Sequence, residues 1–169
     1  MPQWTLFEKD FRSIDRVLNQ LLERSNALSV HLVDRSGQLI TSAGRTGDFD
    51  ATAFASLAAA DFTANAELSQ LLGDEGVEAV VSEGRDRSVH SCLMAERIIM
   101  CTVFDRRSTL GLVRYRAKRA SQELGGVFRG LFEKVGLAEP ELQPMLQMEP
   151  TSPEFALAAS QEVDALFGD

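Results

Sequence analysis

The positions of the prolines constrain this 169-residue chain more than any other feature, because all five lie near its ends. Pro2 comes first, and Pro140, Pro144, Pro150 and Pro153 cluster late. Proline removes a backbone hydrogen-bond donor and breaks helix interiors, so regular structure is expected in the long block without it. The sequence therefore predicts one folded domain over 3–137, a flexible proline-rich linker over 138–153, and a short amphipathic helix or disordered tail over 154–169.

Hydrophobic periodicity within the folded block predicts an α+β domain with the order α-β-β-α-β-β-β-α. Thr5 and Glu8 form a capping box at the start of the first helix, Asp50 can cap the second, and Gly73 can end it. The expected strands are 28–33, 39–42, 77–82, 88–94 and 97–104, and the last helix follows from about 109. Ala95-Glu96 is short enough to predict a hairpin.

The second predicted helix is unusually rich in alanine, from Ala51 to Ala66. A helix with so few bulky side chains allows another backbone to approach closely. This helix is therefore the first candidate for an interface.

The net charge of −8 argues against two kinds of partner. It repels nucleic acid and anionic membrane surfaces, so neither is expected to bind. With no apolar segment of signal or membrane-spanning length, the expected location is the cytoplasm. Two cysteines are too few for a disulfide framework.

The chain offers little that could carry catalysis. If the 88–104 hairpin has a two-residue loop, His90, Cys92 and Cys101 share one face, but they match no zinc pattern and a fourth ligand is not evident. His31 is interpreted as a structural histidine, and the glycines near 44–47 lack phosphate-loop spacing. The sequence predicts no catalytic residue, no metal and no cofactor. A basic run of Arg106, Arg107, Arg114, Arg116, Lys118 and Arg119 could hold acidic groups or a phosphate, or could form a solvated helix face.

Several segments together resemble a known family. They are Leu32-Val33-Asp34-Arg35-Ser36-Gly37-Gln38-Leu39-Ile40, Ala55-Ser56-Leu57-Ala58, Leu71-Leu72-Gly73, Val103-Phe104-Asp105 with Ser108 to Arg114, and the closing Val163-Asp164-Ala165-Leu166-Phe167. The chain resembles the MglB-like members of the Roadblock family, which are partners of small Ras-like GTPases of the MglA type in bacterial motility and polarity. The resemblance covers nearly the whole chain, including the tail.

This resemblance implies a five-stranded antiparallel sheet and a homodimer in which the second helices pack together and the third strands pair into one continuous sheet. The implied dimer residues are Ala55, Ala58, Phe62, Val77 and Ala79. The implied GTPase-binding residues are Ala59, Thr63, Ala66, Glu67 and Gln70, with Val163, Leu166 and Phe167 of the C-terminal helix contacting the partner elsewhere and promoting nucleotide exchange. MglB-like dimers stimulate GTP hydrolysis by repositioning the GTPase's own residues. The resemblance also implies a polar position in the cell through partners.

Phe62, Thr63 and Glu67 depart from the small residues usual in this family, and they enlarge and charge the expected GTPase surface. Such changes can redirect partner choice. Two functions follow: a stimulator of GTP hydrolysis, or a non-catalytic Roadblock scaffold that recruits polarity or signalling proteins. A metal or thiol enzyme built on His90, Cys92 and Cys101 is the third hypothesis.

Overall fold

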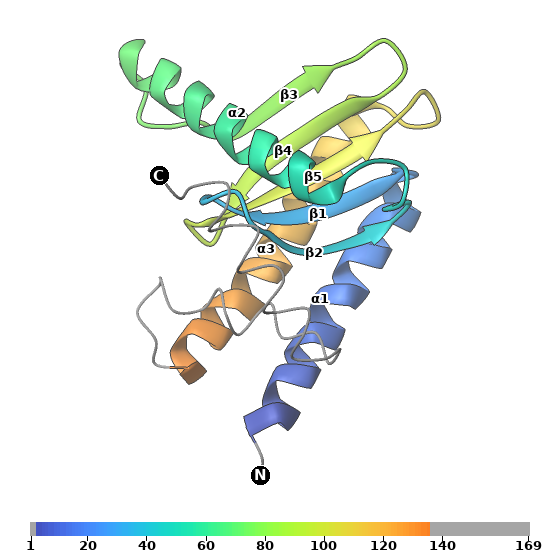
Figure 1. Cartoon of the computed structure of the whole chain (residues 1–169), viewed down its shortest axis with the longest axis vertical. Coiled ribbons are helices and arrows are strands. Elements are labelled where there is room, and N and C mark those ends of the chain that lie inside the picture. The colour runs from blue at the N-terminus through green and yellow to red at the C-terminus, as the bar shows by residue number, and fades with distance from the viewer. Residues whose placement is uncertain (1–2, 136–169) are drawn as a thin grey trace, which may run out of the picture.

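The computed structural model describes residues 3–135, and they form the predicted order of elements (Figure 1). The elements are α1 (Gln3–Ser25), β1 (Ser29–Asp34), β2 (Leu39–Gly44), α2 (Ala51–Leu71), β3 (Ala79–Glu83), β4 (Ser88–Met94), β5 (Ile98–Phe104) and α3 (Leu110–Val135). The linker and tail predicted over 138–169 lie outside the described residues. Helix α1 begins at Gln3, before the cap expected at Thr5, and the third strand begins at Ala79 rather than Val77.

The five strands form one antiparallel sheet in the order β2-β1-β5-β4-β3, which confirms the expected fold class. Strand β5 lies at the centre, and every one of its residues is buried. Strands β2 and β3 form the two edges. An edge strand leaves a row of backbone hydrogen-bonding groups without a neighbouring strand.

One face of the sheet is covered by two long helices. Figure 1 shows α1 and α3 side by side against this face, and α2 on the opposite side. The core here is large and apolar, and Leu32, Met100, Leu124 and Phe128 are fully buried in it. Burial of this size is the main source of the domain's stability.

The opposite face is covered by α2 alone. Ala55, Ala59 and Phe62 of α2 pack on the sheet, where Ile99 and Cys101 of β5 are fully buried. Towards the β3 edge this cover is incomplete, because the remaining apolar side chains are only partly buried: Val77, Val80, Val89 and Leu93. The two faces are therefore covered unequally.

The β4–β5 hairpin corrects the expectation for His90, Cys92 and Cys101. Its loop has three residues, since Met94 pairs with Ile98, and Ala95 and Glu96 both have left-handed φ angles of 49° and 62°. Cys101 therefore pairs with Ser91 and lies on the α2 side, whereas His90 and Cys92 lie on the α1–α3 side. The extra loop residue shifts the register by one and separates the expected cluster.

The two thiols also lie in environments that disfavour a reactive thiolate. Burial raises the pKa of Cys92 to about 12 and that of Cys101 to about 11. Within 3–135, no group of three histidine, cysteine or acidic side chains is placed to hold a metal ion. The same residues contain no helix long and apolar enough to cross a membrane.

His31 makes the folded state sensitive to acid. The side chain is fully buried on the α2 side between Phe49 and Phe54, with ring centroids 5.3 and 4.9 Å away, and its Nε2 lies 3.0 Å from Ser29 Oγ. Burial lowers the pKa of His31 to about 4. Between about pH 4 and 6.5 the folded chain thus keeps the His31 imidazole neutral. In the unfolded chain, the same histidine has a pKa near 6.5 and takes up a proton in this range.

We expect the free energy of unfolding to fall as the pH drops from about 6.5 towards about 4, by up to roughly 3 kcal/mol from His31. Urea titrations across this range measure the effect. In His31→Gln, which retains a polar side chain but does not titrate there, the pH dependence should be clearly smaller, although buried His90 contributes a share. An equal pH dependence in the variant would contradict this assignment.

Candidate partner-binding face

The most accessible element on the sparsely covered side of the sheet is α2, and its ends are set by local sequence. The Asp50 side chain caps the first turn, accepting hydrogen bonds from the backbone N–H groups of Thr52 and Ala53 at 3.0 and 3.1 Å. At the other end, Gly73 has a φ of +86°, which suits glycine after a helix. Both boundaries agree with the sequence prediction.

Positions around α2 divide into four strips because successive residues turn by about 100°. Ala55, Ala59 and Phe62 face the sheet. One flank, which includes Ser69, lies towards the β3 side, where Ser69 donates from Oγ to the Gly76 carbonyl at 3.0 Å. The other flank, which includes Thr63, lies towards the β1–β2 turn, and the strip opposite the sheet is exposed.

The β1–β2 turn holds α2 in place through a close backbone approach at Gly37. A Cβ added to Gly37 would lie 3.3 Å from the Ser56 Cα, and Gly37 has a φ of +96°. The Ser56 hydroxyl donates to the Gly37 carbonyl at 3.4 Å. Glycine is therefore required at this position for both its conformation and its size.

Asp34 fixes the same turn from the strand side. Its carboxylate accepts a hydrogen bond from the Ser36 N–H at 2.8 Å and one from Arg97 Nε at 2.7 Å. Burial alone would raise the pKa of Asp34, but the hydrogen bonds from Ser36 and Arg97 outweigh it and the pKa is lowered. The carboxylate therefore stays ionised and paired at neutral pH.

A hollow of about 400 Å³ lies between this turn and α2. Arg35 and Ser36 line it from the turn, and Ala59, Thr63 and Glu67 are among its α2 residues. It is thus bordered by a cation, an anion and small side chains. Such a surface suits contact with a protein partner better than chemistry, since it brings no nucleophile and base together.

Of the residues predicted for GTPase contact, Ala59, Thr63 and Glu67 line this hollow, whereas Ala66 and Gln70 of the same helix do not. Ala59 is 3% exposed at the floor of the hollow, Thr63 and Ala66 are half-buried, and Glu67 and Gln70 are exposed. The expected contacts of Val163, Leu166 and Phe167 lie outside the described residues.

The residues predicted for the dimer are less accessible. Ala55 and Phe62 are 0% and 2% exposed because they pack on the sheet of their own subunit. Ala58 and Val77 are half-buried on the α2 side, whereas Ala79 packs on the α1–α3 side. Of the residues predicted for the dimer, only Ala58 and Val77 therefore remain available for contact with a second copy, together with the exposed residues beside them.

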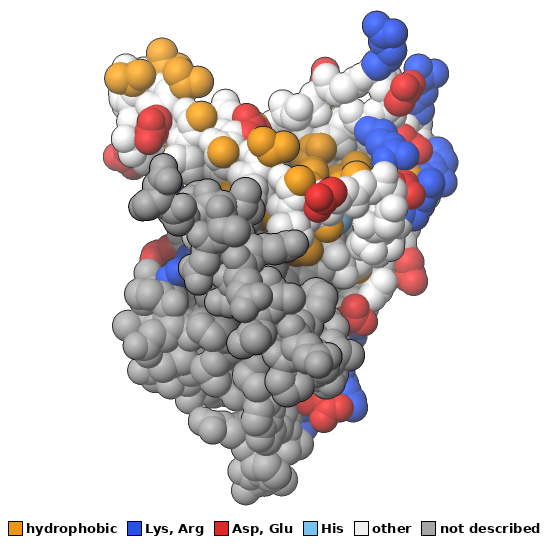
Figure 2. Space-filling view, viewed as in Figure 1, with side chains coloured by type: hydrophobic (Ala, Val, Ile, Leu, Met, Phe, Trp, Pro, Cys, Tyr) orange, Lys and Arg blue, Asp and Glu red, His pale blue; other side chains and the backbone are white. Residues whose placement is uncertain are grey.

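The structure adds exposed leucines that sequence reasoning did not single out. Leu57, Leu68, Leu71 and Leu72 of α2 and its C-cap are 71%, 56%, 84% and 83% exposed. Figure 2 shows hydrophobic side chains gathered along this helix and at its projecting end. The helical spacing of Leu68, Leu71 and Leu72 is the sequence signal that could have indicated this exposed cluster. The same spacing is equally typical of leucines buried along one face of a helix. Exposed apolar clusters of this kind mark interaction surfaces.

A five-stranded antiparallel sheet with two helices on one face and one alanine-rich helix on the other defines a Roadblock-type interaction domain. The model of the Roadblock/LC7 domain family matches residues 13–104, so the chain belongs to this family. Within it the chain is MglB-like: MglB of Myxococcus xanthus is similar at 40% identity and a TM-score of 0.68, over 72% of this chain and 91% of that one.

Two further solved structures are similar to this chain. MglB of Thermus thermophilus, described as a gliding protein, has 25% identity and a TM-score of 0.64, covering 70% of this chain and 90% of its own. A Roadblock/LC7 domain from Streptomyces avermitilis shares the fold at 17% identity and a TM-score of 0.63, covering 68% of this chain and 97% of its own. Among curated proteins there is no match to this chain.

The anchor at Gly37 can be tested by adding one methyl group. Gly37→Ala should lower the free energy of unfolding by about 2 kcal/mol, because the new Cβ meets Ser56 and the backbone has a positive φ. Denaturant unfolding measures this loss. Gly47→Ala is the matched control, since its Cβ would meet nothing within 4 Å. Equal stabilities of the two variants would refute the anchor.

Proposed function

We propose that this protein is a homodimeric regulator of a small Ras-like GTPase of the MglA type, and that it stimulates GTP hydrolysis in bacterial cell polarity or motility. The observation that carries the proposal is the exposed, largely uncharged α2 face on a chain 40% identical to M. xanthus MglB. The family is a regulatory one, and the contribution expected from this chain is a binding surface rather than a catalytic side chain.

The dimer is supported by three features that meet at one side of the molecule. Strand β3 is an open sheet edge, the sheet face beside it is only partly covered, and the end of α2 carries exposed Leu71 and Leu72. A second copy related by twofold symmetry supplies a strand for the edge and a helix for the bare face. We therefore place the dimer seam on the β3 flank of α2, with Ala58 and Val77 close to it.

The GTPase contact is proposed for the opposite flank and the exposed strip, where Thr63, Ala66, Glu67 and Gln70 remain accessible in a dimer. A surface of small and polar side chains can hold the GTPase's own catalytic loop in its productive position. Orientation of this kind lowers the barrier to hydrolysis without an inserted arginine. The segment containing Val163, Leu166 and Phe167 is proposed to contact the GTPase separately and to promote nucleotide exchange.

The scaffold alternative uses the same dimer and the same face, and Glu67 favours it by placing a charge where related proteins have small residues. One assay separates the two functions. A GTP-loaded MglA-type GTPase is mixed with the purified protein, and phosphate release is followed under single-turnover conditions. Faster release supports the regulator, binding without faster release supports the scaffold, and no binding in either nucleotide state overturns both.

Reversing one charge on α2 tests the location of the contact. Glu67→Arg should weaken GTPase binding and its stimulation by at least about tenfold, because it places a bulky cation at the hollow. Glu23→Arg, the same change on exposed α1, should leave both unchanged. Titrated phosphate-release rates provide the measurement. If the two variants lose activity equally, the contact does not lie at the hollow.

Two exposed leucines test the dimer. Leu71→Asp combined with Leu72→Asp should weaken self-association by at least about a hundredfold, since each leucine would exchange apolar burial for a buried charge. Sedimentation velocity at micromolar concentration should then show a single subunit. The control is Leu112→Asp on α3, a leucine 36% exposed on the other side of the sheet, which should remain a dimer. If the double variant is still a dimer, the dimer interface does not lie at the end of α2.

A further inference from the structure

A second hollow lies on the other side of the molecule, between α1 and α3, and is called here the α1–α3 groove. It has a volume of about 640 Å³. Its floor is apolar, made by Val17, Leu21 and Ala120, which are at most 6% exposed. None of the residues predicted for the dimer or the GTPase lines it.

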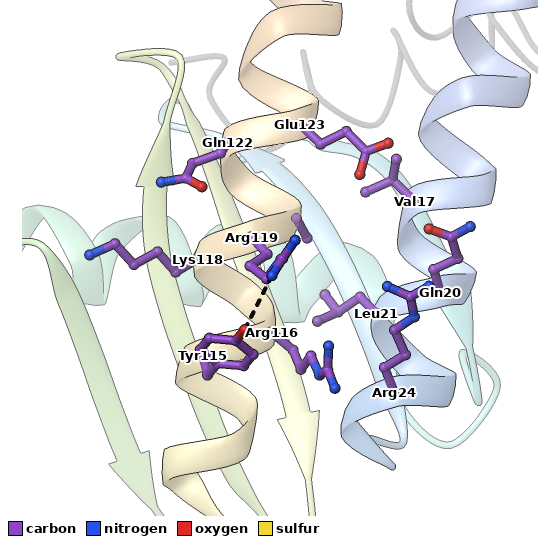
Figure 3. Close-up of a pocket in the computed structure, with 11 residues that line it drawn as sticks. Val17, Gln20, Leu21, Arg24, Tyr115, Arg116, Lys118, Arg119, Gln122 and Glu123 are labelled. Atoms are coloured by element: carbon purple, nitrogen blue, oxygen red, sulfur yellow. Dashed lines mark hydrogen bonds between the residues drawn. The ribbon is translucent and has the colours of Figure 1, made fainter.

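The rim of this groove is positively charged. Arg24 of α1 and Arg116, Lys118 and Arg119 of α3 line it, and none of these four forms a salt bridge with another described residue. Figure 3 shows Arg24 and Arg116 extending towards the gap between the helices, while Lys118 extends from α3 the other way. The acidic residue of the rim, Glu123, pairs with Arg16 at 3.5 Å. The rim therefore carries more positive than negative charge beside an apolar floor.

Arg116 and Tyr115 show that the rim is incompletely satisfied within the described chain. Arg116 Nε is buried, and no described residue accepts a hydrogen bond from it. Tyr115 is 53% exposed, with the Arg116 guanidinium 5.3 Å from its ring centroid, and its hydroxyl accepts a hydrogen bond from Arg119 at 3.2 Å. An occupant that brings both carboxylates and apolar side chains would satisfy both groups.

The chain itself contains a segment of this chemistry. Residues 136–169 include seven acidic residues and no lysine or arginine, which leaves 17 basic and 18 acidic residues in 1–135. Almost the whole net charge thus resides in this segment. Its last part places Phe155, Val163, Leu166 and Phe167 among Glu154, Glu162, Asp164 and Asp169, which predicts an acidic amphipathic helix.

We propose that, when no GTPase is bound, residues 154–169 of this chain bind in the α1–α3 groove of the same subunit, with their acidic side chains on the rim and their apolar side chains on its floor and on Tyr115. The acidic residues of this segment complement the basic rim, and its apolar residues complement the floor, so the groove suits this segment better than a small anion. A groove of this volume around a single phosphate would hold mostly water, since a water molecule takes about 30 Å³.

The connecting segment is long enough for this return. From Lys118 to Val135, α3 extends about 26 Å at 1.5 Å per residue. The 18 residues of 136–153 reach about 60 Å when extended and about 23 Å on average as a flexible coil. Their average reach thus matches the return distance, so the tethered segment experiences a high effective concentration at the groove.

The tail's place can be measured in the full-length protein with a spin label at Ser160→Cys. The native thiols are buried and have pKa values raised to about 12 and about 11, so the introduced thiol reacts selectively. The label should broaden the backbone amide resonances of Gln20 and Ala120, and about 0.5 M NaCl should remove much of this broadening. Broadening confined to the α2 face, or none at all, overturns the proposal.

Charge reversal tests the contact itself. Arg24→Glu with Arg119→Glu should reduce the broadening by about tenfold, because both cations are exposed on the rim and face acidic residues of the tail. Adding Glu162→Lys and Asp164→Lys should restore it. The matched control is Arg106→Glu with Arg129→Glu, which should not change it, since neither lines the groove. If the groove variant fails to fold, the effect of NaCl on the broadening in the protein with the unchanged groove tests the charge contact instead.

Two other occupants are distinguished by the same sample. In a mixed sample, one kind of subunit is isotope-labelled and has no spin label, and the other carries the spin label and no isotope. The isotope-labelled resonances are then broadened only if the tail reaches a second copy, and such broadening overturns binding within one subunit. The second occupant is tested by adding inorganic pyrophosphate. If pyrophosphate shifts the Gln20 and Ala120 resonances and the spin label never broadens them, the groove binds a free anion instead of the tail. No GTPase is present, so failure of this inference and failure of the proposed function are separate results.

Discussion

The structure depends on unequal covering of one five-stranded sheet. Both faces of such a sheet must be shielded from water, since its central strand β5 is buried throughout. Two long helices shield one face, whereas α2, with its small side chains, packs mainly on β1 and β2 and leaves the apolar side chains towards β3 only partly buried. The open β3 edge, the partly covered valines and the exposed leucines all follow from this imbalance.

The alanine content of α2 explains how this helix serves both its own sheet and its surroundings. Ala55 and Ala59 bring the helix axis close to the strands, and Gly37 brings a turn close to Ser56. A helix held this close to its sheet leaves both flanks accessible. One flank borders the uncovered β3 side, and the other borders the hollow beside Arg35, so two different partners can use one helix.

The distribution of charge separates the two sides of the domain. The described part is nearly neutral as a whole, yet four cations line the α1–α3 groove, whereas α2 carries no lysine or arginine. In water such a separation costs little, because exposed charges are well screened. An apolar side and a basic side give the domain two chemically distinct surfaces, which suits a protein that works by contact.

Local rules in the sequence determined the elements and the family. Asp50 and Gly73 set the ends of α2, and the matching segments identified the Roadblock relationship, because each depends on neighbours close in the chain. Only the tertiary structure decided which way side chains face. A third loop residue placed Cys101 opposite to Cys92, and an alanine-rich helix carries no periodic signal for its buried strip. The packing of α1 and α3 likewise brings Arg24 and Arg119 to the rim of one groove, although 95 positions separate them in the sequence.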